Sequence, residues 1–109
     1  MEGRWDGSWR SDSNGHHGSL RCVIQRGDDQ AYRARFRARY AGLLSFGYTV
    51  SLTATNDAPG HWRFRGEADL GRLAGGVYQY EGEVREDAFK SSYRSSGDHG
   101  VFEMNRVER

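Results

Sequence analysis

Residues 31–40 read Ala-Tyr-Arg-Ala-Arg-Phe-Arg-Ala-Arg-Tyr, and from Tyr32 onward arginines alternate strictly with alanines and aromatic residues. Successive side chains of a β-strand leave opposite faces, and no helical period fits this stretch. We therefore predict a strand that buries its alanines and aromatic rings and exposes its arginines. The rest of the chain repeats this pattern or turns between copies of it.

Seven further segments show the alternation of a strand. They are predicted at residues 4–11, 19–26, 43–55, 61–68, 77–85, 88–95 and 100–107. Turn residues separate them, most clearly Asn14-Gly15 and Pro59-Gly60. Eight strands with hairpin-length turns predict an all-β fold, either an antiparallel up-and-down eight-stranded barrel or an open or two-sheet β-sandwich. Between the fifth and sixth strands, a plausible register sets Arg65 near Glu81 and Arg63 near Glu83.

The length and composition narrow the class of protein. A chain of 109 residues fits a single domain, residues 1–109. Sixteen basic and fifteen acidic residues give a net charge of +1, so no overall field attracts the protein to nucleic acid or membrane. No apolar run is long enough for a membrane helix and no signal peptide is visible, which predicts a cytoplasmic protein. Cys22, the only cysteine, is expected as a small core residue.

The inward faces are rich in tyrosine, and these hydroxyls suggest a ligand site. An eight-stranded barrel is filled by its own side chains or holds one small ligand. Small inward residues such as Gly7 and Gly82 either accommodate the tryptophans or leave a pocket. Leu70 and Leu73 lie on an unusually apolar connection, where they could plug the barrel, form a lid or contact another subunit. The candidate ligand-binding residues are Tyr32, Tyr40, Tyr48, Tyr78, Tyr80, Leu70 and Leu73.

Both ends of the chain carry a further pattern. Gly3-Arg4-Trp5 and Gly7-Ser8-Trp9 are two candidates for a Gly-x-Trp element in the first strand, and Arg106 lies in the last strand. In these features the chain resembles the calycin superfamily, which includes lipocalins, fatty-acid-binding proteins, avidins and small bacterial metalloprotease inhibitors. The resemblance implies a barrel closed by an arginine stacked on Trp5 or Trp9. It implies no binding site, and Cys22 has no partner for the disulfide typical of the inhibitors.

Three histidines are expected at one end of a barrel, because strand direction brings the turn after the first strand close to the turn before the last. These are His16, His17 and His99, with Asp12 and Asp98 nearby. Imidazoles with a carboxylate suit zinc, copper or nickel. Adjacent histidines in a turn are more commonly solvated, so we expect no cofactor and keep a transition metal as the alternative.

The arginine row could contact an anionic partner, and it consists of Arg33, Arg35, Arg37 and Arg39. Binding of single-stranded nucleic acid usually also needs exposed aromatic rings, and here the aromatic rings fall on the buried face. A solvated strand face is therefore the expected interpretation, and nucleic acid is not the expected partner.

No catalytic motif is recognisable, so we do not expect an enzyme. The preferred hypothesis is a small calycin-like binding protein that holds an apolar or aromatic ligand in or at the mouth of the barrel. A protein-interaction or inhibitor-like module with a filled core is the main alternative.

Overall fold

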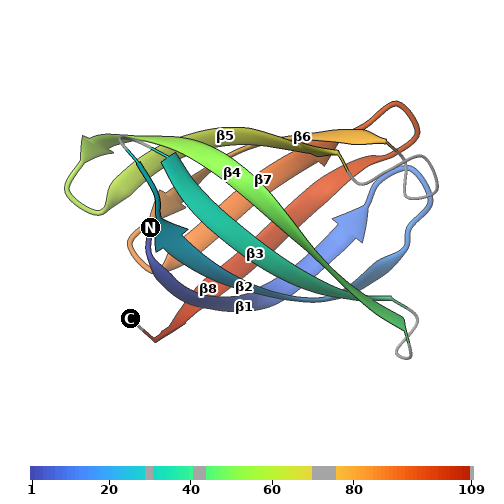
Figure 1. Cartoon of the computed structure of the whole chain (residues 1–109). Coiled ribbons are helices and arrows are strands. Elements are labelled where there is room, and N and C mark those ends of the chain that lie inside the picture. The colour runs from blue at the N-terminus through green and yellow to red at the C-terminus, as the bar shows by residue number, and fades with distance from the viewer. Residues whose placement is uncertain (29–30, 41–43, 70–75, 109) are drawn as a thin grey trace.

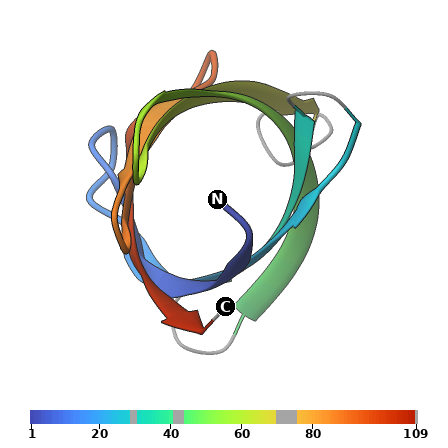
Figure 2. The same ribbon diagram turned by 90° about the vertical axis from the view of Figure 1, so that its left-hand side faces the viewer.

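The protein forms a closed barrel in a computed structural model that describes residues 1–28, 31–40, 44–69 and 76–108, without the side chains of residues 40, 44, 46 and 108. Its strands are β1 Gly3–Ser11, β2 His17–Arg26, β3 Ala31–Tyr40, β4 Leu44–Ala58, β5 His61–Asp69, β6 Val77–Arg85, β7 Ala88–Arg94 and β8 His99–Glu108. Each strand pairs antiparallel with the next, and β8 pairs with β1 (Figures 1 and 2). The predicted up-and-down barrel is confirmed, and the sandwich alternative is wrong. Within the described residues, no helix has the length and apolar character needed to cross a membrane.

Strands β3 and β6 have the predicted bounds, whereas β4 continues to Ala58. The pairing of β4 with β5 continues past a register shift between Asn56 and Ala58. The Asn56 amide donates hydrogen bonds to the carbonyls of Ala58 and His61, each at 2.8 Å. These bonds hold the end of β4 against β5. The strand therefore continues beyond the segment in which apolar and polar residues alternate.

The inward side chains of all eight strands form one core, as the alternation predicted. Trp5, Ala34 and Val50 have no measurable exposure. The Trp5 and Phe64 rings pack on Phe89 with centroid distances of 5.6 and 4.7 Å. This part of the barrel is filled by side chains, and burial of its apolar surface is the main stabilising contribution.

Glycines at inward positions mark places where neighbouring strands approach closely. A Cβ added at Gly7 would lie 1.8 Å from the carbonyl oxygen of Glu103, and one at Gly82 would lie 2.1 Å from that of Lys90. Only a residue without a side chain fits such positions, which is how sharply curved strands close a barrel. The choice left open in the sequence is thus resolved: at these two glycines the neighbouring backbone occupies the space.

One end of the barrel, here called the N-terminal end, is closed by the start of the chain. Figure 2 shows the N-terminus inside the ring of strands. Met1 is buried, and its carbonyl accepts a hydrogen bond of 3.0 Å from Trp5 Nε1. The guanidinium of Arg106 lies over the Trp5 ring. Of the two Gly-x-Trp candidates, the first therefore provides the tryptophan that the arginine covers.

Candidate functional site

At the opposite end, β1 connects to β2, β3 to β4, β5 to β6 and β7 to β8; we call it the tyrosine end. Three nearly parallel rings lie inside the barrel towards this end. The Phe36 and Tyr48 centroids are 5.2 Å apart with an interplanar angle of 13°. Tyr80 lies 6.4 Å from each of them, at 12° and 16°. Strands β3, β4 and β6 each contribute one of these rings. The three residues are on the inward face of their strands and lie at a similar height along the barrel axis.

A second group of rings lies beside this stack. Phe102 packs 5.7 Å from Tyr80 and 5.0 Å from Tyr93. Tyr78 follows, with its centroid 6.0 Å from that of Tyr93. Tyr80 and Tyr93 are buried, whereas Tyr48 and Tyr78 are half-buried and pack against the core. The aromatic packing thus continues to partly accessible rings.

The hydroxyl groups of Tyr48, Tyr80 and Tyr93 stay neutral over a wide pH range. Burial raises the pKa of Tyr93 to about 12, with a smaller contribution from the negative charge of Asp98. Burial also raises the pKa of Tyr48 and of Tyr80 well above the ordinary value of 10. Their hydroxyls interact with each other, so each already has a neighbour within the cluster.

The hydroxyl of Tyr93 differs from these. It is buried and, within the described residues, makes no hydrogen bond of normal geometry, although its interaction with the Ser11 hydroxyl partly offsets the effect of burial on its pKa. A Cβ at position 100 would lie 2.6 Å from this oxygen, so Gly100 is needed to make room for it. A buried hydroxyl without a partner costs free energy, and a ligand or water that pairs with it would recover that cost.

The structure separates the predicted ligand residues instead of gathering them. Tyr32 lies at the N-terminal end, where its ring meets Trp62 edge to face at 6.0 Å. Tyr48, Tyr78 and Tyr80 belong to the tyrosine end. The predictions for Leu70, Leu73 and the Tyr40 side chain lie outside the described residues. Tyr93 is not among the predicted ligand residues, because the burial of a hydroxyl has no sequence pattern.

The metal site considered for the histidines is not assembled. Strand closure does bring His99 to the turn after β1, where its Nδ1 lies 3.0 Å from the Ser13 hydroxyl. Within the described ranges, however, no three His, Cys, Asp or Glu side chains are grouped to hold a metal ion. His16 and His17 are exposed and do not join His99 in such a group. His99 was correctly expected at the same end as His16 and His17. The grouping of their side chains that a metal site needs is not seen among the described residues.

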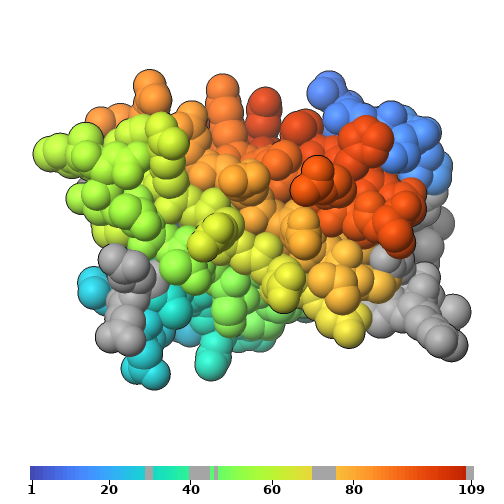
Figure 3. Space-filling view, turned by 90° about the horizontal axis from the view of Figure 1, so that it is seen from above, coloured from blue at the N-terminus to red at the C-terminus, as the bar shows by residue number. Residues whose placement is uncertain are grey.

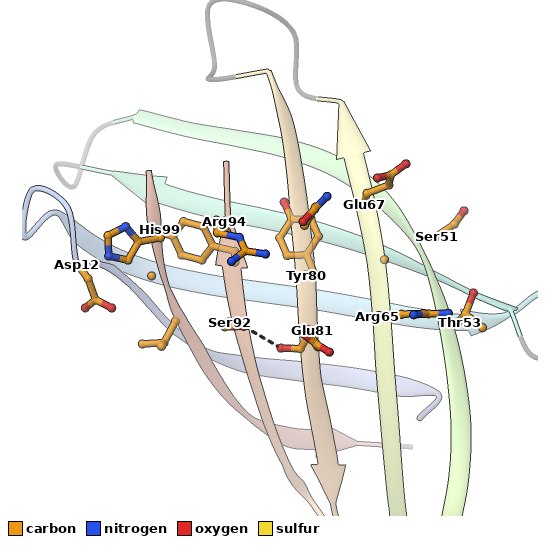
Figure 4. Close-up of a pocket in the computed structure, with 15 residues that line it drawn as sticks. Asp12, Ser51, Thr53, Arg65, Glu67, Tyr80, Glu81, Ser92, Arg94 and His99 are labelled. Carbon is orange, nitrogen blue, oxygen red and sulfur yellow. Dashed lines mark hydrogen bonds between the residues drawn. The ribbon is translucent and has the colours of Figure 1, made fainter. Parts of the chain in front are cut away.

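A broad hollow of about 800 Å³ lies on the outer face of the barrel, over β5, β6 and β7 and the edges of β4 and β8. Figure 3 shows the side of the molecule that carries β5 and β6. Figure 4 shows its polar lining, with Arg65 and Glu67 on β5, Glu81 on β6 and Arg94 on β7. The Ser92 hydroxyl donates a hydrogen bond of 3.2 Å to the Glu81 carbonyl. Charges of both signs alternate across this surface, so the hollow lacks the mostly apolar wall that is typical of sites for organic ligands.

The cross-strand register predicted for β5 and β6 is confirmed, although the charges pair differently. Residues opposite each other are Arg63 and Glu83, and Arg65 and Glu81. Glu83 Oε2 lies 3.0 Å from His61 Nε2, and this hydrogen bond lowers the pKa of the Glu83 carboxyl. Arg63 instead pairs with Asp57 at 2.8 Å. The cross-strand register can be predicted from the alternation of residues in each strand. The ion pairs cannot, because long charged side chains can reach partners on the same strand or on a neighbouring one.

Comparison with known proteins identifies the fold only. No protein-family model and no curated protein matches the chain. A solved structure of a de novo designed fluorescence-activating β-barrel is similar over 97% of this chain and 93% of the designed chain. Its TM-score is 0.66 and its sequence identity is 21%. The chain thus has the architecture of a small antiparallel eight-stranded barrel.

Proposed function

We propose that the protein is a single-domain, calycin-like binding barrel that takes a small, flat aromatic ligand at the mouth of its tyrosine end. The buried hydroxyl of Tyr93, which makes no hydrogen bond of normal geometry within the described residues, carries this proposal together with the half-buried ring of Tyr78 beside it. Small-molecule sites combine apolar and aromatic walls with a few polar groups that fix orientation. Tyr93 provides the polar group, and Tyr48 and Tyr78 provide accessible rings.

The packing inside the barrel supports a site at the mouth. Phe36, Tyr80 and Phe102 fill the level below the mouth with mutual centroid distances of 5.6 to 6.4 Å. A ligand inside the barrel would have to displace these rings. At the mouth it would stack on Tyr48 or Tyr78 in the offset arrangement that aromatic rings prefer. Only the side chains that cover the buried Tyr93 hydroxyl would have to shift for the ligand to pair with it.

The chemistry of the cluster defines the class of ligand. The raised pKa of Tyr93 keeps its hydroxyl neutral, so it serves as a hydrogen-bond donor or acceptor and not as a charge. A neutral aromatic compound with one carbonyl or hydroxyl matches this group best. The designed barrel of similar fold is fluorescence-activating, and environment-sensitive fluorescent aromatic compounds are therefore suitable first probes.

The test is a fluorescence titration of the protein with a panel of such probes. We expect at least one probe to brighten on binding, and Tyr93→Phe to weaken it about fivefold through the loss of a hydrogen bond worth about 1 kcal/mol. Tyr32→Phe at the N-terminal end is the matched control and should leave binding unchanged. Binding by no probe, or equal weakening by both variants, would overturn the proposal.

A protein-interaction barrel is the second candidate, favoured by the filled core around Trp5 and Phe89. It predicts that outward substitutions, and not Tyr93→Phe, remove the biological partner. The two candidate functions can therefore be distinguished, because each predicts that a different set of substitutions removes binding.

A further inference from the structure

The outer face of β3 carries four arginines, which we call the arginine face; they are Arg33, Arg35, Arg37 and Arg39. All four are exposed. Figure 1 shows that β3 runs between β2 and β4, so the face is bordered by these two strands. In the part of the chain that the structure describes, none of the four has an ion pair, whereas Arg63 and Arg106 each pair with a carboxylate at 3.0 Å or less.

The neighbouring strands offer these arginines no carboxylate. On β2 the residues opposite Arg33, Arg35 and Arg37 are Gln25, Val23 and Arg21. On β4 the residues opposite the four arginines are Ser51, Thr49, Gly47 and Ser45. The only acidic residue in the three strands is Asp57, which pairs with Arg63 on β5. The arginine face is therefore a stripe of like charge whose repulsion nothing in these strands offsets.

We propose that the arginine face binds an extended acidic segment of a protein partner, with carboxylates at every second residue. Alternate residues of a strand are about 6.8 Å apart, so the four arginines span about 20 Å in a nearly straight row. An extended peptide with Asp or Glu at alternate positions has the same repeat. Each guanidinium can hold a carboxylate through two parallel hydrogen bonds, which a lysine cannot do.

The composition of this face favours a protein over single-stranded nucleic acid. Proteins that bind single strands stack bases on exposed aromatic rings. The aromatic residues Tyr32 and Phe36 of β3 are buried on the inner face, and the large apolar side chain exposed beside the arginines is Val23. Hydroxyls of Thr49 and Ser51 on β4 add hydrogen-bond donors beside the arginines. The face thus supplies donors for carboxylates but no surface for bases.

The test compares two labelled peptides of the same composition by fluorescence anisotropy, one with Glu and Thr strictly alternating and one with Glu-Glu-Thr-Thr repeats. We expect the alternating peptide to bind at least about fivefold more tightly, and binding to weaken as salt rises from about 50 to about 200 mM. Arg35→Glu with Arg37→Glu should abolish binding, and the milder Arg35→Gln with Arg37→Gln should weaken it. Arg65→Glu with Arg94→Glu, on β5 and β7, makes the same charge change outside the arginine face and should have little effect.

Three results would overturn the proposal. Equal affinity for the two peptides would show that charge alone, and not the repeat, is recognised. Unchanged binding by the Arg35/Arg37 variants would place the contact elsewhere. A random-sequence DNA duplex that binds more tightly than the alternating peptide, with a salt slope of about −0.9 per phosphate contacted, would assign the face to nucleic acid. None of these results bears on the ligand site at the tyrosine end.

Discussion

The guanidinium carbon of Arg106 lies 4.3 Å from the centroid of the Trp5 ring, and this contact joins the last strand to the first. Arg106 Nε also donates a hydrogen bond of 3.0 Å to the Asp87 carboxylate, and Nη1 donates to the Glu2 carbonyl. The arginine thus links β8, β1 and the β6–β7 turn at the N-terminal end. It covers an indole that has no exposure of its own.

Arg106→Ala should lower the free energy of unfolding by about 2 kcal/mol, because it removes a cation–π contact, an ion pair and the cover of a core residue. Urea unfolding monitored by tryptophan fluorescence measures this. Arg85→Ala is the control, since the Arg85 side chain is 68% exposed and lies 3.9 Å from Glu83. Its effect should stay within about 0.5 kcal/mol, and equal losses in both variants would contradict the assigned role of Arg106.

Gly7→Ala should destabilise the barrel by about 1 to 3 kcal/mol or prevent closure, because the new methyl group would meet the backbone of Glu103 on β8. Gly97→Ala provides a matched control, since a Cβ at Gly97 meets nothing within 4 Å. Thermal unfolding followed by circular dichroism compares the two variants. A Gly7→Ala protein as stable as Gly97→Ala would show that the strands need not approach so closely.

The sequence predicted the faces of the strands well because a two-residue period is easy to detect in segments such as residues 31–40. It did not predict how far along the barrel axis each inward side chain lies. Tyr32 and Tyr48 both point inward, yet strand direction places them at opposite ends. The candidate site was therefore only partly recognised, and the buried hydroxyl of Tyr93 depends on packing against Gly100 that no local pattern reveals.

Alkaline pH should destabilise the protein partly through Tyr93. Its pKa rises from 10 in the unfolded chain to about 12 in the folded barrel, since burial disfavours the phenolate. The resulting stabilisation is complete below pH 10 and is lost as pH rises through the folded pKa. Tyr93→Phe should lose less stability than the wild type between pH 9 and about 12, as measured by urea unfolding at each pH. Parallel losses would contradict the burial of this hydroxyl.

Near neutral pH the same substitution should leave the free energy of unfolding unchanged or raise it by up to about 1 kcal/mol, because it removes a buried hydroxyl whose contact with Ser11 lacks the geometry of a hydrogen bond. Tyr80→Phe is the comparison, since the Tyr80 hydroxyl interacts with Tyr48. Its loss should be destabilising. A clear loss of stability in Tyr93→Phe would show that the hydroxyl is satisfied in the folded protein.

The thiol of Cys22 should be inert in the folded protein. It is 2% exposed, and burial raises its pKa well above the ordinary value of 9.0. A thiol reagent should therefore react only as fast as the barrel opens, and at full speed in urea. Rapid reaction under native conditions would show that the interior near β2 and β3 is accessible.

The proposed ligand site at the tyrosine end is tested most directly by an NMR titration. The tyrosine ring resonances are followed while an aromatic probe that binds the protein is added stepwise. We expect the resonances of Tyr48, Tyr78 and Tyr93 to shift, because stacked rings and a new hydrogen bond change their surroundings. Tyr32, at the N-terminal end, should not move. Shifts confined to Tyr32, or spread evenly over the whole barrel, would contradict a ligand site at the tyrosine end.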